Sequence, residues 1–245
     1  MTTMNIEKKY DWNSMSLYEF LKEGNIPSYW KEFFEEETDN LKSISNKIQE
    51  SQAENKLVVY PEINRVFRAF YITPLENIRV AVIGMEPYAD GNAVGLCFSI
   101  PTNSTYVNPS LKNIYNELED EGYSPKRDGN LVPWAKQGVF LINAFLTVEK
   151  GNSGSHSHVW YNFTKKLLNY ISEKRKNIVW VLLGNDALEF REYIKSDGKN
   201  ILCSTHPSPF SAYRDSKKAK AFLGSGIFKN VNEKLKDMGK TEIVW

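Results

Sequence analysis

The sequence predicts a single α/β domain with a central four-stranded parallel sheet flanked by helices. Four short runs are rich in Val, Ile and Leu and are apolar almost throughout, at residues 78–83, 139–143, 178–183 and 200–204. Such runs are typical of strands that are buried on both faces of a parallel sheet. Helix-like stretches separate them, and this alternation favours a parallel α/β architecture. No linker-like segment divides the chain.

Helical spacing dominates the region before the first strand. Between residues 16 and 52 apolar side chains recur at intervals of three and four, beginning with Leu17, Phe20 and Leu21. Pro61 is placed to open another short helix. Residues 1–14 are polar, so we expect a loosely held N-terminal extension followed by one domain over residues 15–245.

The segments between and after the strands predict four further helices. Each contains apolar residues at helical spacing among polar ones. They lie at residues 110–119, 160–173, 186–194 and 217–237. The last prediction starts inside a lysine-rich segment.

Composition excludes several classes of protein. The chain has 245 residues, of which 41% are hydrophobic and 25% charged, and this is ordinary globular usage rather than that of a disordered, collagen-like or coiled-coil chain. There are 31 Lys and Arg against 30 Asp and Glu, a formal net charge of +1. A protein that holds nucleic acid by bulk charge would be far more basic. Any contact with nucleic acid must therefore come from a local patch.

Cysteine usage and hydropathy indicate an intracellular protein. Cys97 and Cys203 are too few for a disulfide scaffold and are expected to be reduced. No apolar run is long enough to span a membrane, and the N-terminus lacks the apolar core of a secretory signal. His156 and His158 have no cysteine pair or third histidine beside them, so no metal site is expected.

Polar residues follow each of the four predicted strands. Residues 84–88 follow the first, Asn143 ends the second, residues 184–186 follow the third and residues 205–211 follow the fourth. Ligands of open parallel sheets bind beyond the carboxyl ends of the strands. We therefore expect a carboxylate, a carboxamide and an imidazole to face one crevice. That set serves catalysis without a metal or nucleotide cofactor, and no phosphate-binding glycine motif is present.

Each of these groups also has a simpler interpretation. Glu86 could be a solvated turn residue, and Asn143 could cap the turn that follows it. His206 could be a buried core histidine, and residues 206–209 could form a rigid polyproline-like loop. The placement of all of them at successive strand ends favours an active site.

Four separate motifs give the chain its resemblance to a known family. The first motif has two parts, Gly-Met-Glu-Pro-Tyr-Ala from residue 84 and Gly-Leu-Cys-Phe-Ser from residue 95. Asn-Pro-Ser-Leu-Lys starts at residue 108, Gly-Val-Phe-Leu-Ile-Asn runs to residue 143, and His-Pro-Ser-Pro-Phe-Ser starts at residue 206. In order and spacing the chain resembles the family-1 uracil-DNA glycosylases, with weaker similarity from about residue 26 to residue 245.

The resemblance implies a hydrolase of base excision repair. Such an enzyme flips uracil out of DNA and hydrolyses its N-glycosidic bond, leaving an abasic site. It needs no cofactor. The expected partner is single- or double-stranded DNA that contains uracil or a modified pyrimidine, and the expected state is a monomer. The expected location is a prokaryotic cytoplasm, in association with the nucleoid, or a nucleus.

The resemblance also implies which residues bind the base. Phe98 would stack on the flipped base, a contact worth about 1–3 kcal/mol. Tyr88 would occupy the space of the thymine methyl group and so exclude thymine. Asn143 would pair with uracil N3–H and O4, an order of donor and acceptor that cytosine reverses. Met85 would lie against the base.

Catalysis and DNA binding are assigned in the same way. His206 resembles the neutral histidine that donates to uracil O2, and Glu86 stands where the family has the Asp that orients the attacking water. Phe210 takes the place of the apolar wedge that fills the gap left by the flipped nucleotide. The remaining positions expected to contact DNA are Pro109, Ser110, Ser208, Pro209, Ser211, Tyr213, Arg214, Lys217, Lys218 and Lys220.

The chain departs from the family motif at three positions. Glu86 replaces Asp, and its extra methylene group moves the carboxylate by about 1.5 Å. Ala89 replaces a His and Met85 replaces a Gln. These changes leave two alternatives open, which are a glycosylase for another modified pyrimidine, as in phage DNA, and a catalytically weakened DNA-binding or replication accessory protein. The lysine-rich segment 215–220 is interpreted either as added phosphate contacts or as the solvated start of a helix.

Overall fold

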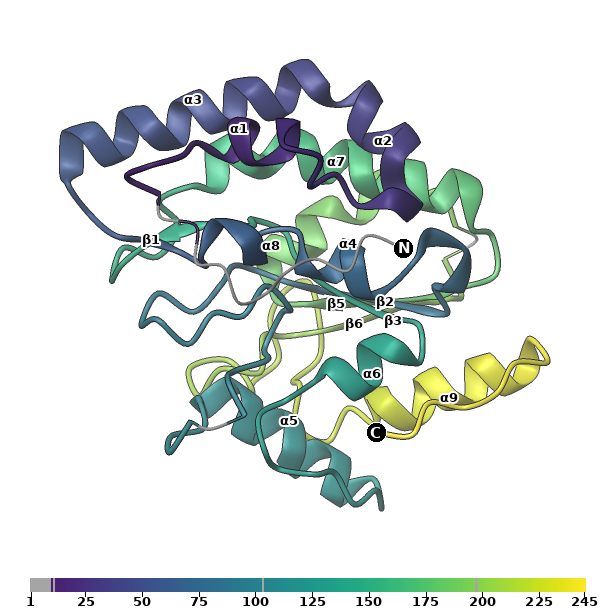
Figure 1. Ribbon diagram of the computed structural model, residues 1–245. Helices are drawn as coiled ribbons and strands as arrows, with labels where there is room; N and C mark the ends of the chain where they lie inside the picture. The colour runs from purple at the N-terminus through teal and green to yellow at the C-terminus, as the bar shows by residue number, and fades with distance from the viewer. Residues whose placement is uncertain (1–9, 11, 103, 197) are drawn as a thin grey trace.

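A four-stranded parallel sheet forms the centre of the molecule in a computed structural model that describes residues 10, 12–102, 104–196 and 198–245 (Figure 1). Its strands are arranged in the order β3-β2-β5-β6. They are β2 (Val80–Gly84), β3 (Val139–Asn143), β5 (Val179–Leu183) and β6 (Ile201–Ser204). Gly84 pairs with Asn143 at the carboxyl end of the β2–β3 ladder. The predicted fold class is confirmed, and each apolar run overlaps its strand, with β2 extending one residue past its run to Gly84.

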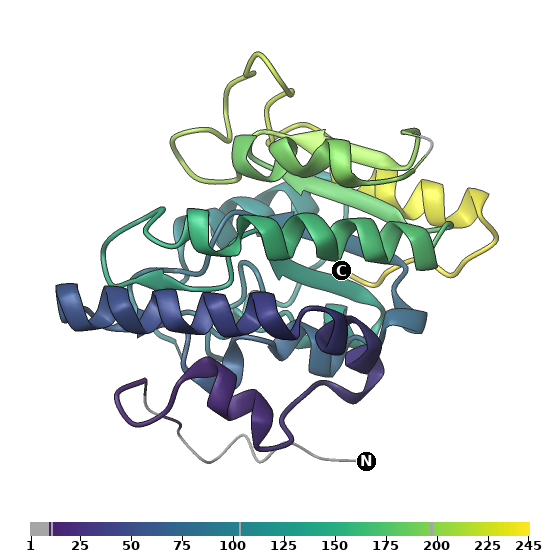
Figure 2. The ribbon, with the colours of Figure 1, turned by 90° about the horizontal axis from the view of Figure 1, so that it is seen from above.

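Helices cover both faces of this sheet. On one face lie α1 (Leu17–Lys22), α2 (Lys31–Glu36), α3 (Thr38–Asn55) and α7 (Ser157–Lys174), and Figure 2 shows α3 and α7 side by side. On the other face lie α5 (Pro109–Asp120), α6 (Val132–Lys136) and α9 (Ile227–Asp237). None of the helices in the described ranges is long and apolar enough to cross a membrane.

Short helical elements complete the chain between these layers. They are the α-helices α4 (Arg68–Ile72) and α8 (Asn185–Glu189) and the 3-10 turns η1 (Ser28–Trp30), η2 (Ile63–Arg65), η3 (Leu75–Asn77) and η4 (Phe190–Tyr193). The expected helix over residues 186–194 is therefore one α-helical turn that continues as a 3-10 turn. The helix expected near Pro61 is represented by η2 and α4.

Aromatic side chains fill the space between the N-terminal helices and the sheet. Trp30 stacks on Phe140 of β3 with ring centroids 5.1 Å apart. Phe70 of α4 meets both rings edge-on, and its centroid lies 6.4 Å from that of Phe163 of α7. Large buried aromatic side chains contribute much of the apolar area of a core. This cluster joins the helical layer, which the sequence pattern predicted, firmly to the sheet.

The expected N-terminal extension lies mostly outside the described residues, which omit 1–9 and 11. Within the described part, Trp12 is buried and its indole N–H donates to the Pro61 carbonyl at 2.9 Å. Helix α1 then begins with a capping box, in which Ser16 and Glu19 bond each other's backbone N–H groups.

Two features differ from the expected secondary structure. Residues 217–226 are not helical, and α9 starts only at Ile227. The side chain of Asp215 accepts the Ala221 N–H at 2.9 Å, and Ser216 accepts the Ala219 N–H at 3.0 Å. Side chains that capture nearby N–H groups in this way compete with the helix. The second difference is a short antiparallel pair, β1 (Val59–Tyr60) and β4 (Val148–Glu149), which no pattern predicted.

Both cysteines are free thiols, as expected. Cys97 is buried and Cys203 is half-buried. Burial raises the pKa of the Cys97 thiol above its ordinary value, so this side chain behaves as an inert core residue.

Candidate active site

A pocket of about 570 Å³ opens at the carboxyl ends of the parallel strands. Its walls come from the segments that follow β2 and β6 and from the start of α5. The predicted site residues that line it are Met85, Glu86, Tyr88, Phe98, Ser110, His206, Ser208, Phe210, Ser211 and Arg214. The structure thus brings together groups that are more than 120 positions apart in the sequence.

His206 presents a neutral imidazole to this pocket. Burial lowers its pKa from 6.5 to about 4. The backbone N–H of Ser208 donates to Nδ1 at 3.1 Å, so the ring proton resides on Nε2. Gly184 allows this placement because a Cβ atom there would lie 3.0 Å from the His206 Cβ. The result is a neutral N–H donor on the pocket wall.

Phe98 lies next to His206, with ring centroids 5.7 Å apart. Its backbone has φ of 63°, the left-handed region that costs a residue with a side chain about 1–3 kcal/mol. The Tyr88 hydroxyl donates to the Phe98 carbonyl at 3.2 Å and helps to hold this conformation. Two aromatic rings and an imidazole therefore line one side of the pocket.

Asn143 lies behind these rings rather than on the open wall. It ends β3, it is buried, and its Oδ1 would be 2.7 Å from a Cβ atom placed on Gly84, which would also lie 3.3 Å from Phe98 Cε2. Only glycine fits between the two side chains. Among the described residues, the Asn143 side-chain amide has no hydrogen-bond partner. Asn143 itself does not line the pocket.

The Glu86 carboxylate is held by the turn that precedes α7. Its Oε2 accepts the Gly154 N–H at 2.9 Å, and its Oε1 accepts the hydroxyl hydrogen of Ser153. Ser153 also lines the pocket. The carboxylate thus has a fixed place at one side of the same cavity as His206.

The segment between β6 and α9 carries the residues that project from the pocket rim. Phe210 is 86% exposed and Tyr213 is 67% exposed. Beneath them, the Asn113 amide donates to the Pro207 carbonyl at 2.8 Å, and the Thr205 hydroxyl donates to the Ser211 carbonyl at 2.9 Å. An exposed phenyl ring on a well-anchored loop is suited to contact a partner.

The lysines of segment 215–220 are partly compensated by acidic neighbours. Lys220 Nζ lies 2.7 Å from Asp215 Oδ2, and Lys218 Nζ lies 3.6 Å from Glu189 Oε1. Lys217 is exposed. The positive charge of this segment is therefore smaller than a count of its lysines indicates.

Comparisons with known proteins identify the family. The model of the uracil DNA glycosylase superfamily matches residues 70–235. The chain belongs to this superfamily. A uracil-DNA glycosylase of Wolinella succinogenes is 40% identical over 231 residues, covering 92% of this chain and 96% of the relative. One of Azotobacter vinelandii is 38% identical over 225 residues, covering 90% and 94%.

Solved structures of the superfamily have the same fold. The crystal structure of mimivirus uracil-DNA glycosylase superposes with a TM-score of 0.83 at 25% identity, covering 99% of this chain and 96% of that one. A mimivirus variant solved in complex with UGI gives 0.80 at 28% identity, covering 96% and 97%. The fold expected from the four motifs is thereby confirmed.

Sequence reasoning missed part of the site of this superfamily member. Ser153 and Gly154 contact Glu86, although 67 and 68 positions separate them from it. No motif marks them, and the short β4 strand that leads to their turn was not predicted either. Asp215 and Ser216 also line the pocket and were not among the predicted site residues.

His156 and His158 do not form part of a metal cluster. Within the described ranges, no three His, Cys, Asp or Glu side chains gather to hold a metal ion. The His156 ring is buried, and its Nδ1 lies 2.8 Å from the Thr147 hydroxyl oxygen. Its environment is that of an internal hydrogen-bonded residue.

Proposed function

We propose that this protein removes uracil from DNA by hydrolysing the bond between the sugar C1′ and the base N1. The observation that carries the proposal is the neutral His206, whose Nε2–H is left free beside Phe98 on the pocket wall. When that bond breaks, its electron pair goes to the base and negative charge develops on uracil O2. A positioned N–H donor stabilises such charge, and loss of one donor typically costs about 10²–10³ in rate.

Base selection rests on Phe98 and Tyr88 of the pocket wall and on Asn143 behind them. Phe98 offers a ring face on which a flipped base stacks. Asn143 has a free amide that matches the N3–H and O4 of uracil and mismatches cytosine. Tyr88 borders the pocket and is fixed by its bond to the Phe98 carbonyl, so it excludes a methyl group at C5 by contact. Met85 completes the wall next to the base.

Glu86 is proposed to orient the attacking water. The carboxylate accepts a hydrogen bond from the water, faces the positive charge that develops on the sugar, and receives the water proton as the C1′–O bond forms. The uracil anion leaves with the electron pair of the broken bond. The His206 hydrogen bond to O2 persists throughout, and the atoms and charges of the reaction balance without a cofactor.

The DNA backbone is proposed to lie across the pocket rim. Ser110 stands in the first turn of α5, where helix N–H groups and the helix dipole favour phosphate. The hydroxyl groups of Ser208 and Ser211 contribute further phosphate contacts, and Pro109, Pro209, Tyr213 and Arg214 border them. The Phe210 ring inserts between the stacked bases of the DNA, in the gap left by the flipped nucleotide. The enzyme acts as a monomer, in a prokaryotic cytoplasm in association with the nucleoid or in a nucleus.

Incubation with uracil-containing oligonucleotides tests the proposal. Wild-type protein should produce alkali-labile sites at uracil in single- and double-stranded DNA, whereas thymine and cytosine should remain intact. Glu86→Ala and His206→Ala should each lower the single-turnover rate by at least about 10²-fold. No cleavage at a large excess of wild-type enzyme would contradict the proposal. Release of another base from modified DNA, in place of uracil, would show that the substrate is a different pyrimidine.

A further inference from the structure

The turn at Ser153 and Gly154 holds Glu86 through two hydrogen-bond donors. Ser153 donates its hydroxyl hydrogen to one carboxylate oxygen of Glu86, and Gly154 donates its N–H to the other at 2.9 Å. A glutamate has one more rotatable bond than an aspartate, so more freedom must be removed to place its carboxylate. Two donors on two different oxygens fix both the position and the rotation of the group.

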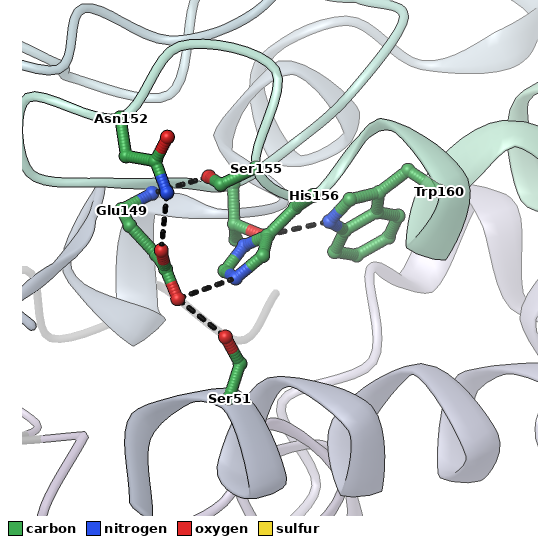
Figure 3. Close-up of polar contacts among 7 residues, drawn as sticks. Ser51, Glu149, Asn152, Ser155, His156 and Trp160 are labelled. Atoms are coloured by element: carbon green, nitrogen blue, oxygen red, sulfur yellow. Dashed lines mark hydrogen bonds and ion pairs between the residues drawn. The ribbon is translucent and has the colours of Figure 1, made fainter. Parts of the chain in front are cut away.

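The same turn is tied from the inside to Glu149, the last residue of β4 (Figure 3). Glu149 is only 1% exposed. Its Oε2 accepts the Asn152 amide at 2.8 Å, and its backbone N–H donates to the Ser155 hydroxyl oxygen at 2.9 Å. Residues on both sides of the Ser153–Gly154 pair are thus bound to one buried residue.

Glu149 is also bound to the helical layer. Its Oε1 accepts the hydroxyl hydrogen of Ser51 from α3 and lies 3.9 Å from His156 Nε2 (Figure 3). His156 is bound in turn to Thr147, which accepts the Trp160 indole N–H at 2.7 Å. The groups around Glu149 therefore come from α3, from β4 and its turn, and from the start of α7. A turn so connected has little freedom to shift.

We propose that Ser153 and Gly154 form a clamp that fixes the Glu86 carboxylate for catalysis, and that Glu149 holds this clamp in place. Ser153 and Glu149 are positioning residues, which act on the reaction through Glu86. The inference rests on the proposed function, because it states how the proposed water-orienting group is held. It also explains how a longer carboxylate serves at position 86.

A double-mutant cycle tests the clamp through its coupling to Glu86. Ser153→Ala should lower kcat on the order of 10-fold at unchanged KM, since an ångström-scale displacement of a reacting group can cost up to about 10² in rate. In a Glu86→Ala background the same change should have no further effect. Ser153→Thr keeps the hydroxyl and should restore most of kcat. Ser28→Ala, an exposed serine remote from the pocket, is the matched control and should equal wild type.

Glu149→Gln extends the cycle to the buried support. It should lower kcat in the wild-type background and leave kcat unchanged in the Glu86→Ala background. If this variant fails to fold, as its lowered Tm would reveal, the Ser153 cycle decides alone. Equal losses from Ser153→Ala in the presence and absence of the Glu86 carboxylate would overturn the clamp.

A measurement without turnover separates the clamp from the proposed function. In a ¹H–¹⁵N spectrum, Glu86→Ala should shift the Gly154 amide resonance strongly upfield, because its hydrogen bond to the carboxylate is removed. A Gly154 resonance that does not move would overturn the clamp even in an active enzyme. A shifted resonance in a protein that excises no uracil would refute the proposed function and the catalytic role of the clamp, but not the hydrogen bond itself.

Discussion

The backbone N–H of Ser208 donates to Nδ1 of His206 at 3.1 Å, and this bond determines which ring nitrogen carries the proton. A histidine whose Nδ1 accepts from the backbone can only donate through Nε2. Burial makes the neutral form persist by lowering the pKa to about 4. The tautomer and the charge state of the proposed donor are therefore set before any substrate binds.

Stability should depend on pH through His206. Its folded-state pKa of about 4 lies below the ordinary 6.5, so between these values the unfolded chain binds a proton that the folded protein does not. The free energy of unfolding should therefore fall as pH is lowered from 6.5 to 4, by roughly 3 kcal/mol at most from this residue. Urea unfolding at several pH values, with wild type and His206→Gln, measures the contribution. His158→Gln, an exposed histidine, is the control, and an identical pH dependence in all three proteins would contradict it.

Catalysis should not follow the ordinary titration of histidine. Because His206 stays neutral, kcat should show no loss with a midpoint near pH 6.5 when the pH is lowered from 8 to 5.5. Single-turnover rates at constant ionic strength measure this profile. A loss centred at pH 6.5 that disappears in His206→Gln would show that protonation of this ring blocks the reaction in that range, contrary to expectation.

Gly184→Ala should lower kcat by more than any accompanying loss of folded protein explains. The new methyl group would lie 3.0 Å from His206 Cβ and 3.2 Å from Cδ2, so the imidazole must move. We expect kcat to fall by roughly 10-fold, because a shift of a few tenths of an ångström is smaller than the displacement near 1 Å that can cost about 10²-fold. Gly24→Ala is the matched control, since its φ is also positive and no atom lies within 4 Å of the added Cβ. Equal kcat values for the two variants would refute the steric argument.

Phe210→Ala should affect DNA binding without affecting the fold. The ring is 86% exposed, so its removal should change Tm by less than about 2 °C. Loss of an apolar wedge should weaken base flipping from duplex DNA much more than from single strands. Excision rates on both substrates give the ratio, and Val244→Ala, another exposed apolar residue, provides the control. A uniform loss on both substrates would argue against insertion into the stack.

Neutralising Lys217, Lys218 and Lys220 together should weaken binding to all DNA sequences alike. Removal of one lysine–phosphate ion pair should reduce the salt slope of binding by about 0.9 for duplex DNA. Because Lys220 pairs with Asp215 and Lys218 lies near Glu189, we expect a reduction smaller than three such ion pairs would give. Titrations at several salt concentrations measure the slope, with Lys42→Gln on α3 as control. An unchanged slope in the triple variant would exclude phosphate binding by these lysines.

The strands were predictable because burial on both faces leaves a continuous apolar run, as in Val139–Asn143. The ends of those strands also predicted that Glu86 and His206 would border one pocket, since parallel strands share one carboxyl edge. The non-helical segment before Ile227 was not predictable, because its form depends on local bonds made by Asp215 and Ser216. The hydrogen bond between Ser153 and Glu86 depends on the path of a distant turn, which no local pattern encodes.

Glu117 of α5 helps to order the segment between β6 and α9 before DNA binds. Its buried carboxylate accepts the N–H groups of Gly224 and Gly226 at 2.6 and 2.8 Å, while Asn113 of the same helix holds Pro207 near the other end. Both ends of the loop that carries Phe210 are thus fastened to one helix. The conformational entropy of this loop is lost on folding, so association with DNA should proceed with little coupled ordering of protein and with a correspondingly small contribution to the heat-capacity change.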